Sequence, residues 1–296
     1  MTTTTGRTTT HTLEVPGATL TYDIRRNEQS TDPILLMIGS PMGAAGFGTL
    51  ASHFSDRTIV TYDPRGVERS HKAGPSRPST PDEHADDLHR LIAELDAGPV
   101  EIFATSGGAV NALALVAKYP EDVSTLVAHE PPIIDVLPDR DAAAAASEAV
   151  HDAYLRDGFG AGMARFIALV SHQGPFPDDW ADQPAPDPAT FGLPTEDDGS
   201  RDDPLLAQDA ESGTAHYQPD FEAIRAAPTR LVVAAGAESE GTLTHRAAVG
   251  VAGRLGTEAV IFPGDHGGFL GGEYGQTGDP DAFAAKLRDV VLGAEA

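Results

Sequence analysis

The sequence predicts an α/β protein whose mostly parallel, doubly wound sheet has about eight strands. Two observations support this fold class. Short apolar segments alternate with helical segments along residues 1–132 and 218–296, which is the rhythm of parallel strands joined by right-handed crossovers. The rhythm breaks between residues 133 and 217. We therefore expect residues 1–132 and 218–296 to form a core domain and residues 133–217 to form a helical lid inserted after the sixth strand.

Turn signals and apolar runs place the elements of the first half. Pro16-Gly17 predicts the turn of an opening hairpin. Thr80 begins a capping box completed by Glu83, with Pro81 at the first helical position. The segment after Ser106 is apolar nearly all round, so its helix should be buried. The expected strands are residues 13–15, 18–24, 33–38, 58–62, 100–105 and 123–128, and the expected helices lie near 47–54, from 81 to the stop at 98–99, and from the turn at 106 to about 118.

The second half begins with the lid. Helical segments are expected around residues 140–156 and 160–171, and a proline- and aspartate-rich passage with the only tryptophan, Trp180, follows them. An alternative is that residues 175–203 form a disordered excursion. The core pattern then resumes, with strands at 231–235 and 259–262, a helix carrying Leu243 and Leu255, and a last helix that opens at Asp279-Pro280.

Charge and composition exclude several classes of partner. The 296 residues carry a formal net charge of −25 and no cysteine. So large a negative charge argues against binding to nucleic acid or to an anionic membrane, and without cysteine neither disulfides nor thiolate metal sites can form. Residues 1–10 lack the apolar core of a signal peptide and should be a frayed tail or the lead-in to an edge strand. No apolar run approaches the roughly 20 residues that span a bilayer, so we expect a cytoplasmic protein.

The segment around Ser106 carries the strongest catalytic signal. A short apolar run ends at Ala104-Thr105-Ser106-Gly107-Gly108, and an alanine-rich helical segment follows. A strand that turns sharply into a helix needs small residues, because the backbone passes through a strained conformation. The pattern resembles the nucleophile elbow G-x-S-x-G, with alanine in place of the first glycine. It predicts a serine hydroxyl presented above the sheet at a helix N-terminus.

Several expected strand ends carry residues suited to acyl transfer. In an open parallel sheet these ends meet at one edge, where ligands bind. Acyl transfer needs a nucleophile, a base, a group that orients the base, and donors for the oxyanion. Ser106 supplies the hydroxyl, and His266, in a glycine-rich loop after the last strand, is the candidate base. The polar residues at the strand ends are Ser40, Asp63, Ser106, Glu130 with Glu238, and His266.

Taken together, the motifs resemble those of the α/β-hydrolase fold superfamily. The resemblance rests on Ile38-Gly39-Ser40-Pro41, similar to an H-G-x-P oxyanion loop with isoleucine for histidine, and on Asp63-Pro64-Arg65-Gly66 with Ser70, similar to D-x-R-G-x-G-x-S. The elbow and Gly264-Asp265-His266 complete it. It implies an α/β-hydrolase fold, an oxyanion hole formed by the N–H groups of Ser40 and Gly107, and the chain order serine, acid, histidine.

Two glutamates compete for the role of triad acid. Most of the superfamily place the acid after the penultimate strand in a G-x-x-D pattern, but here Gly236-Ala237-Glu238-Ser239 has serine at that position and Glu238 one residue early. Glu130 instead ends the strand that follows the nucleophile helix. Some haloalkane dehalogenases and the zearalenone lactonases resemble this chain in the position of their acid. We favour Glu130, with Glu238 as the alternative.

The resulting hypothesis is a serine hydrolase without a cofactor or metal, acting on a small-molecule carboxylic ester or lactone. The lactone could be a macrocycle such as zearalenone. The alternatives are a non-hydrolytic small-molecule receptor and a cofactor-free lyase or oxygenase on the same fold. His129 is expected to be structural, and Asp63 with Arg65 to form an ion pair or turn brace. Candidates for substrate contact are Pro41 and Met42 of the oxyanion loop and Trp180, His216 and Tyr217 of the lid, with His172 also considered.

Overall fold

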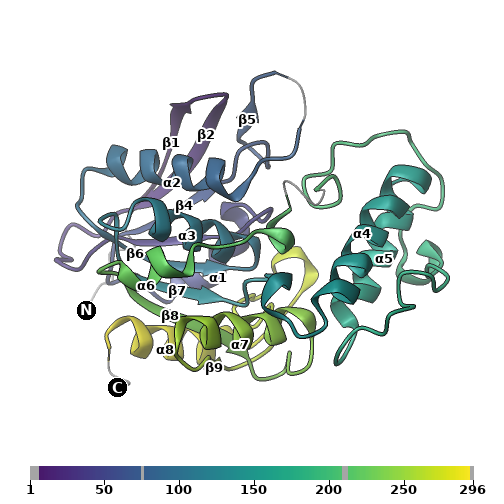
Figure 1. Ribbon diagram of the computed structural model, residues 1–296. Helices are drawn as coiled ribbons and strands as arrows, with labels where there is room; N and C mark the ends of the chain where they lie inside the picture. The colour runs from purple at the N-terminus through teal and green to yellow at the C-terminus, as the bar shows by residue number, and fades with distance from the viewer. Residues whose placement is uncertain (1–6, 75–76, 209–212, 294–296) are drawn as a thin grey trace.

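The computed structural model describes residues 7–74, 77–208 and 213–293. Within them, one mixed sheet of nine strands has the order β1-β2-β4-β3-β6-β7-β8-β9, with the short β5 paired to β2 (Figure 1). The pairs that β2 makes with β1, β4 and β5 are antiparallel, and all others are parallel. The strands are β1 (Thr8–Val15), β2 (Ala18–Arg25), β3 (Leu35–Ile38), β4 (Ile59–Asp63), β5 (His71–Lys72), β6 (Val100–Thr105), β7 (Val123–His129), β8 (Arg230–Gly236) and β9 (Val260–Phe262).

Helices cover both faces of this sheet, which confirms the predicted fold class. On one face α2, α3, α6 and α7 contribute to a single apolar cluster with the strands. On the other face α1 and α8 pack against the sheet with an aromatic cluster that includes Phe103 and Phe283. The bounds are α1 (Gly48–Ser52), α2 (Pro81–Leu95), α3 (Gly107–Lys118), α6 (Phe221–Ala226), α7 (Leu243–Leu255) and α8 (Pro280–Val291), with the 3-10 helices η1 (Ala44–Phe47) and η5 (Glu273–Gly275) beside them.

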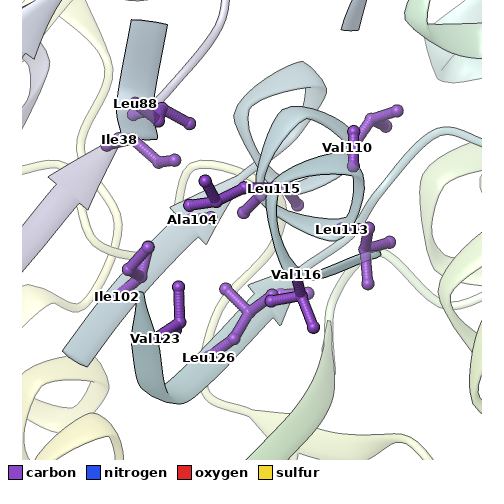
Figure 2. Packing of buried hydrophobic residues seen from close by; sticks show 14 of the residues in the cluster. Ile38, Leu88, Ile102, Ala104, Val110, Leu113, Leu115, Val116, Val123 and Leu126 are labelled. Atoms are coloured by element: carbon purple, nitrogen blue, oxygen red, sulfur yellow. The ribbon is translucent and has the colours of Figure 1, made fainter. Parts of the chain in front are cut away.

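Helix α3 is the most deeply buried of the core helices, as its uniformly apolar sequence predicts. Figure 2 shows Leu113 and Val116 of α3 in the same buried apolar cluster as Ile102 of β6 and Leu126 of β7. All four side chains are fully buried. Burying a side chain of this size contributes about 1.5–3 kcal/mol, so the helix that begins at the elbow is fixed rigidly on the sheet.

The described residues of the predicted lid, 133–208 and 213–217, lie mainly to one side of the sheet (Figure 1). Its helices α4 (Arg140–Asp157) and α5 (Phe159–Ser171) pack against each other around an apolar cluster that also includes Leu243 and Ala247 of α7. The proline-rich passage after them is anchored by Arg165, whose guanidinium donates to the backbone carbonyls of Trp180, Ala181 and Gln183. The remaining elements of this layer are the 3-10 helices η2 (Ile134–Val136), η3 (Pro188–Phe191) and η4 (Thr214–His216).

Two details of the sequence-based prediction are corrected. The sheet has a ninth strand, β5, because two residues are too few to show a periodicity; the lid therefore follows the seventh strand rather than the sixth. Of the N-terminal segment, Thr8–Thr10 belong to β1 at the sheet edge, whereas residues 1–6 lie outside the described residues. In the described chain, no helix combines the length and apolar character needed to cross a membrane.

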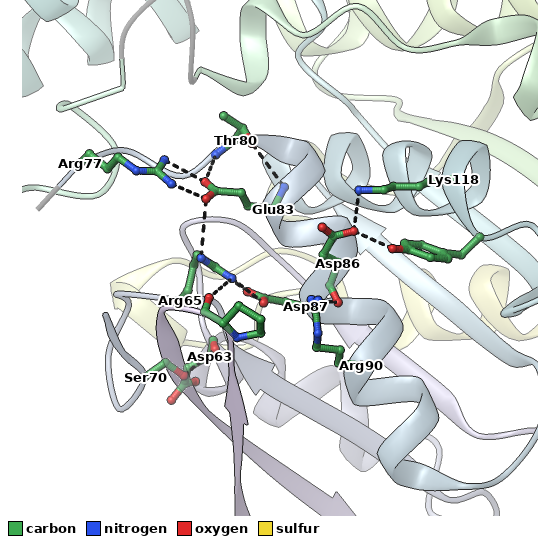
Figure 3. Close-up of polar contacts among 12 residues, drawn as sticks. Asp63, Arg65, Ser70, Arg77, Thr80, Glu83, Asp86, Asp87, Arg90 and Lys118 are labelled. Carbon is green, nitrogen blue, oxygen red and sulfur yellow. Dashed lines mark hydrogen bonds and ion pairs between the residues drawn. The ribbon is translucent and has the colours of Figure 1, made fainter. Parts of the chain in front are cut away.

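Asp63 and Arg65 both brace the loops above the sheet, but not by pairing with each other. The Asp63 carboxylate accepts from the Ala44 N–H at 2.8 Å and from Arg69 Nε at 2.6 Å. Arg65 makes two hydrogen bonds of 2.6 Å to the carboxylate of Asp87 on α2 (Figure 3). Each charge thus holds a different loop in place beside the strand ends.

Candidate active site

Ser106 lies at the turn between β6 and α3. Its backbone has φ 57° and ψ −132°, a positive-φ conformation that costs a residue other than glycine about 1–3 kcal/mol. Its N–H donates to the carbonyl oxygen of His129 at 2.9 Å, which ties the turn to the end of β7. Because Gly107 is the first residue of α3, its N–H has no acceptor inside the helix. The serine therefore sits in the strained turn that the elbow pattern predicts, at a helix end that favours negative charge.

The two glycines of the elbow are required by close backbone contacts. A Cβ atom on Gly107 would lie 2.6 Å from the carbonyl oxygen of Ser40, and one on Gly108 would lie 2.7 Å from the Cα of Gly39. Both distances are too short for a real side chain. The loop after β3 and the elbow therefore touch backbone to backbone, and this contact brings Ser40 beside Gly107.

The structure brings His266 and Glu130 into direct contact, although 136 positions separate them in the sequence. The Nδ1–H of His266, in the loop after β9, donates to Glu130 Oε2 at 2.6 Å. Glu130 directly follows β7 with φ 48°, and its side chain is fully buried. Its own N–H donates to the carbonyl oxygen of Ala234 at 2.9 Å. The backbone thus turns the carboxylate across the end of β8 toward the histidine loop.

Three further donors hold the Glu130 carboxylate, and none of them was predicted. Oε1 accepts from the Gly236 N–H at 2.9 Å and from the Ser239 hydroxyl, and Oε2 accepts from Thr244 Oγ1 at 2.8 Å. Burial alone would raise the pKa of Glu130, but the hydrogen bond from His266, the nearby His129 and the Ser239 hydroxyl hold it well below the usual range. The sequence feature that could have indicated these donors is the series of hydroxyl-bearing residues after β8, which includes Ser239 and Thr244.

Glu238 and His129 have different surroundings. Glu238 is exposed at the edge of the cavity described below, and its N–H donates to the carbonyl oxygen of Gly264 at 2.9 Å. His129 is fully buried among phenylalanine rings, and burial lowers its pKa to about 4. Its Nδ1 lies 3.0 Å from the Thr105 hydroxyl. His129 is therefore a neutral packing residue beneath the site.

Ser106 and His266 line the same cavity, which has a volume of about 950 Å³ and lies between the core and the lid. Its wall is mainly apolar and comes from both layers. Among the predicted contact residues, Pro41, Met42 and His216 line this cavity. The apolar lining residues from the lid include Val150, Met163, Phe166, Leu169 and Leu205.

Two of the predicted substrate contacts, Trp180 and Tyr217, are not among the described residues that line the cavity. Trp180 is buried in the lid's own core, where it packs edge-on against Phe176 and under the Arg165 guanidinium. The Tyr217 hydroxyl donates to Asp82 of α2 at 3.2 Å. His172 likewise stacks on Phe176 rather than facing the cavity. In this structure both aromatic rings of this passage, His172 and Trp180, therefore pack on Phe176.

No group of three or more histidine, aspartate or glutamate side chains that could hold a metal ion occurs within the described ranges.

A family model for the alpha/beta hydrolase fold matches residues 32–204. The uncharacterized hydrolase YraK of Bacillus subtilis (strain 168) is 30% identical over 264 residues, which is 87% of this chain and 89% of YraK. The chain belongs to the α/β hydrolase family.

Solved structures of this family agree with the fold along nearly the whole chain. An alpha/beta hydrolase from Sphaerobacter thermophilus has a TM-score of 0.62 at 20% identity and covers 95% of this chain and 100% of its own. A thermophilic esterase from Thermogutta terrifontis also has a TM-score of 0.62, at 18% identity, and covers 98% of this chain and 100% of its own. At these identities the likeness establishes the fold, so the reaction has to be argued from the site.

Proposed function

We propose that this α/β hydrolase is a serine hydrolase that cleaves a carboxylic ester or lactone through an acyl-enzyme. Ser106 is the nucleophile, His266 the general base and Glu130 the acid that orients His266. One observation supports this assignment above the others: His266 Nδ1 is held 2.6 Å from a buried carboxylate, while the histidine and Ser106 line one cavity. A histidine whose Nδ1–H is fixed in this way leaves Nε2 as the proton acceptor.

In the first half of the reaction the Ser106 hydroxyl oxygen attacks the carbonyl carbon, and its proton passes to Nε2 of His266. This transfer requires the Ser106 hydroxyl and His266 Nε2 to come within hydrogen-bond distance of each other. The imidazolium is stabilised by Glu130, which is ionised because its pKa is held low. Collapse of the tetrahedral intermediate breaks the bond to the alkoxy oxygen, which takes the proton from His266 and leaves an acyl group on Ser106.

In the second half a water molecule gives a proton to His266 Nε2 and attacks the acyl carbon. The intermediate then releases the carboxylic acid, and the proton returns to Ser106. The oxyanion formed in both halves lies next to the backbone N–H groups of Gly107 and Ser40. Each such donor typically stabilises the transition state by about 3–4 kcal/mol.

The cavity suggests a substrate with a bulky apolar part. Its volume of about 950 Å³ is at the upper end of small-molecule pockets, and methionine, valine, leucine and phenylalanine side chains form much of its wall. A macrocyclic lactone such as zearalenone would fit this description, and Glu130 resembles the acid of zearalenone lactonases in its place after β7. The lactone is therefore the finer form of this proposal, and zearalenone is its first test compound.

The test is to compare the wild type with Ser106→Ala on 4-nitrophenyl esters of increasing acyl length and on zearalenone. We expect ester turnover to fall by at least about 10⁴-fold in the variant while circular dichroism and the thermal midpoint stay unchanged. Incorporation of ¹⁸O from labelled water into the acid product is expected of a hydrolase but not of a lyase or oxygenase. Retained turnover in Ser106→Ala would overturn the assignment of the nucleophile, and a wild type that binds esters without cleaving them would favour a receptor.

A further inference from the structure

A second, polar cavity of about 440 Å³ opens beside the catalytic cavity. The two share part of their walls, including Ser40 and Pro41 from the core and His151 and Gln208 from the lid. Because Ser40 is the proposed oxyanion donor, the second cavity begins next to the place where the reacting carbonyl would lie. A substrate that reacts at Ser106 can therefore extend into it.

The core side of this second cavity is cationic, although the whole chain carries a net charge of −25. It includes Arg65 and Lys72. The Arg65 charge is compensated by two hydrogen bonds to Asp87, with Glu83 at 3.9 Å (Figure 3). The Lys72 ammonium donates to the backbone carbonyl of Arg77, and among the described residues no carboxylate lies within ion-pair distance of it. Burial and the Arg65 charge lower the pKa of Lys72. Because no described carboxylate pairs with Lys72, its ammonium can form an ion pair with an anionic ligand in the cavity.

His84, on the same wall, is a buried polar group without a partner. Its side chain is 6% exposed and lines the cavity, and Nδ1 has no hydrogen bond within the part of the chain that the structure describes. Burial and the charges of Arg65 and Lys72 lower its pKa to about 3. A neutral imidazole can still donate a hydrogen bond from one nitrogen. An unpaired buried group of this kind is destabilising, and the ring can donate to a ligand in the cavity.

The described carboxylates that line this cavity form no ion pair or hydrogen bond with these two groups, and the nearby Glu83, which favours their charged forms, is already paired with Arg77 and Arg65. Asp203 accepts from the N–H groups of Leu205 and Leu206 at 3.0 and 2.9 Å, so it caps a turn of the lid. Glu68 is exposed and accepts from the Tyr274 hydroxyl at 3.1 Å. The third carboxylate, Asp202, is exposed to solvent. These carboxylates are thus exposed to solvent or hydrogen-bonded to other groups. None of them pairs with Lys72 or His84 on the core side of the cavity.

We propose that Lys72 and His84 bind a carboxylate carried by the substrate at a distance from the ester bond that Ser106 attacks. This assignment rests on the proposed function and narrows it to esters or lactones of molecules that also bear a free acid. One unmatched ammonium with one imidazole suits a monoanionic carboxylate better than a dianionic phosphate. Zearalenone carries no carboxylate, so it would occupy the apolar cavity alone and should be the poorer substrate.

The first test compares two matched substrates, mono-4-nitrophenyl adipate and its methyl ester, which differ only in the free acid. We expect the wild type to prefer the acid in kcat/KM by about tenfold, against the repulsion that a net charge of −25 exerts on an anion. In Lys72→Met the preference should vanish, while kcat/KM for the methyl ester stays within about threefold. Lys118→Met is the control for charge, because Lys118 pairs with Asp86 at 2.6 Å at the far end of α3 from Ser106. It should keep the preference.

The second test does not depend on turnover. Ser106→Ala is titrated with adipate while the ring nitrogens of ¹⁵N-labelled histidine are followed by NMR, the His84 signals being assigned with His84→Gln. We expect a saturable shift of the His84 signals that disappears when Lys72→Met is added. If the NMR shift occurs but neither ester is cleaved, the carboxylate site stands and the proposed hydrolysis fails. If both esters are cleaved equally and adipate leaves His84 unchanged, this inference alone is overturned.

Discussion

Two neighbouring strands are each followed by a glutamate, and the two carboxylates differ in burial and in hydrogen bonding. After β7, Glu130 is fully buried and accepts four hydrogen bonds, one of them from His266. After β8, Glu238 is exposed at the cavity edge. Orienting a catalytic histidine requires a carboxylate whose own position is fixed. The comparison shows that fixation comes from the donors around a strand end rather than from the strand end itself.

The end of β8 serves the proposed triad in another way. Its residues Gly236 and Ser239, with Thr244 at the start of α7, supply three of the four donors that Glu130 accepts. A buried carboxylate without donors would be costly and would become protonated. A serine in place of the more usual acid after β8 therefore matches a glutamate one strand earlier, because the hydroxyl compensates the burial of the relocated carboxylate.

The largest expected effect is a difference in kcat between variants of Glu130 and Glu238. Glu130→Gln keeps the size of the side chain but removes the charge that stabilises the imidazolium, so kcat for a 4-nitrophenyl ester should fall by about 10³- to 10⁴-fold. Glu238→Gln should change kcat by less than about threefold, because that carboxylate is exposed and lies apart from the His266 ring nitrogen that Glu130 binds. Steady-state kinetics on both variants check this. Comparable losses in the two variants would remove the distinction between the strand ends.

A smaller loss of kcat is expected when one of the hydrogen-bond donors to Glu130 is removed. Thr244→Val preserves the shape of the side chain but removes the 2.8 Å hydrogen bond to Glu130 Oε2, so the carboxylate gains freedom and kcat should fall by about tenfold. Thr244→Ser restores a hydroxyl and should recover most of the loss, with KM little changed in both variants. If the serine variant is as slow as the valine variant, Thr244 acts through packing and not as a donor.

How far the sequence predicts this molecule differs between core and lid. The core strands and helices follow from local patterns, such as the capping box at Thr80 and the apolar surface of α3, and the structure has them. The two-residue β5 is too short to leave a pattern. In the site, motif spacing points to Ser106, His266 and Glu130, but the positive φ of Glu130 and the donors from Ser239 and Thr244 depend on contacts between distant segments.

The lid is less predictable from the sequence than the core is. Its two helices are predictable from the sequence, but the orientation of its aromatic side chains is not. Trp180 could face either substrate or the lid's own core, and both environments are apolar. The structure places it in the lid core, under Arg165 and against Phe176, and only these tertiary contacts decide between the two environments. The unpartnered His84 could not be predicted at all, since nothing in its helix sets it apart from a packed surface histidine.

The smallest expected effect concerns stability in acid. Because the pKa of Glu130 is lower in the folded than in the unfolded protein, its contribution to stability is complete above the unfolded value of about 4.3 and is lost as the pH falls below it. Between pH 5 and 3.5 the free energy of unfolding should therefore fall by about 1 kcal/mol more in the wild type than in Glu130→Gln. Glu238→Gln should follow the wild type, because it leaves Glu130 and its four donors in place. Urea unfolding at several pH values measures all three, and parallel curves for the wild type and Glu130→Gln would mean that the buried carboxylate is not stabilised by its four donors.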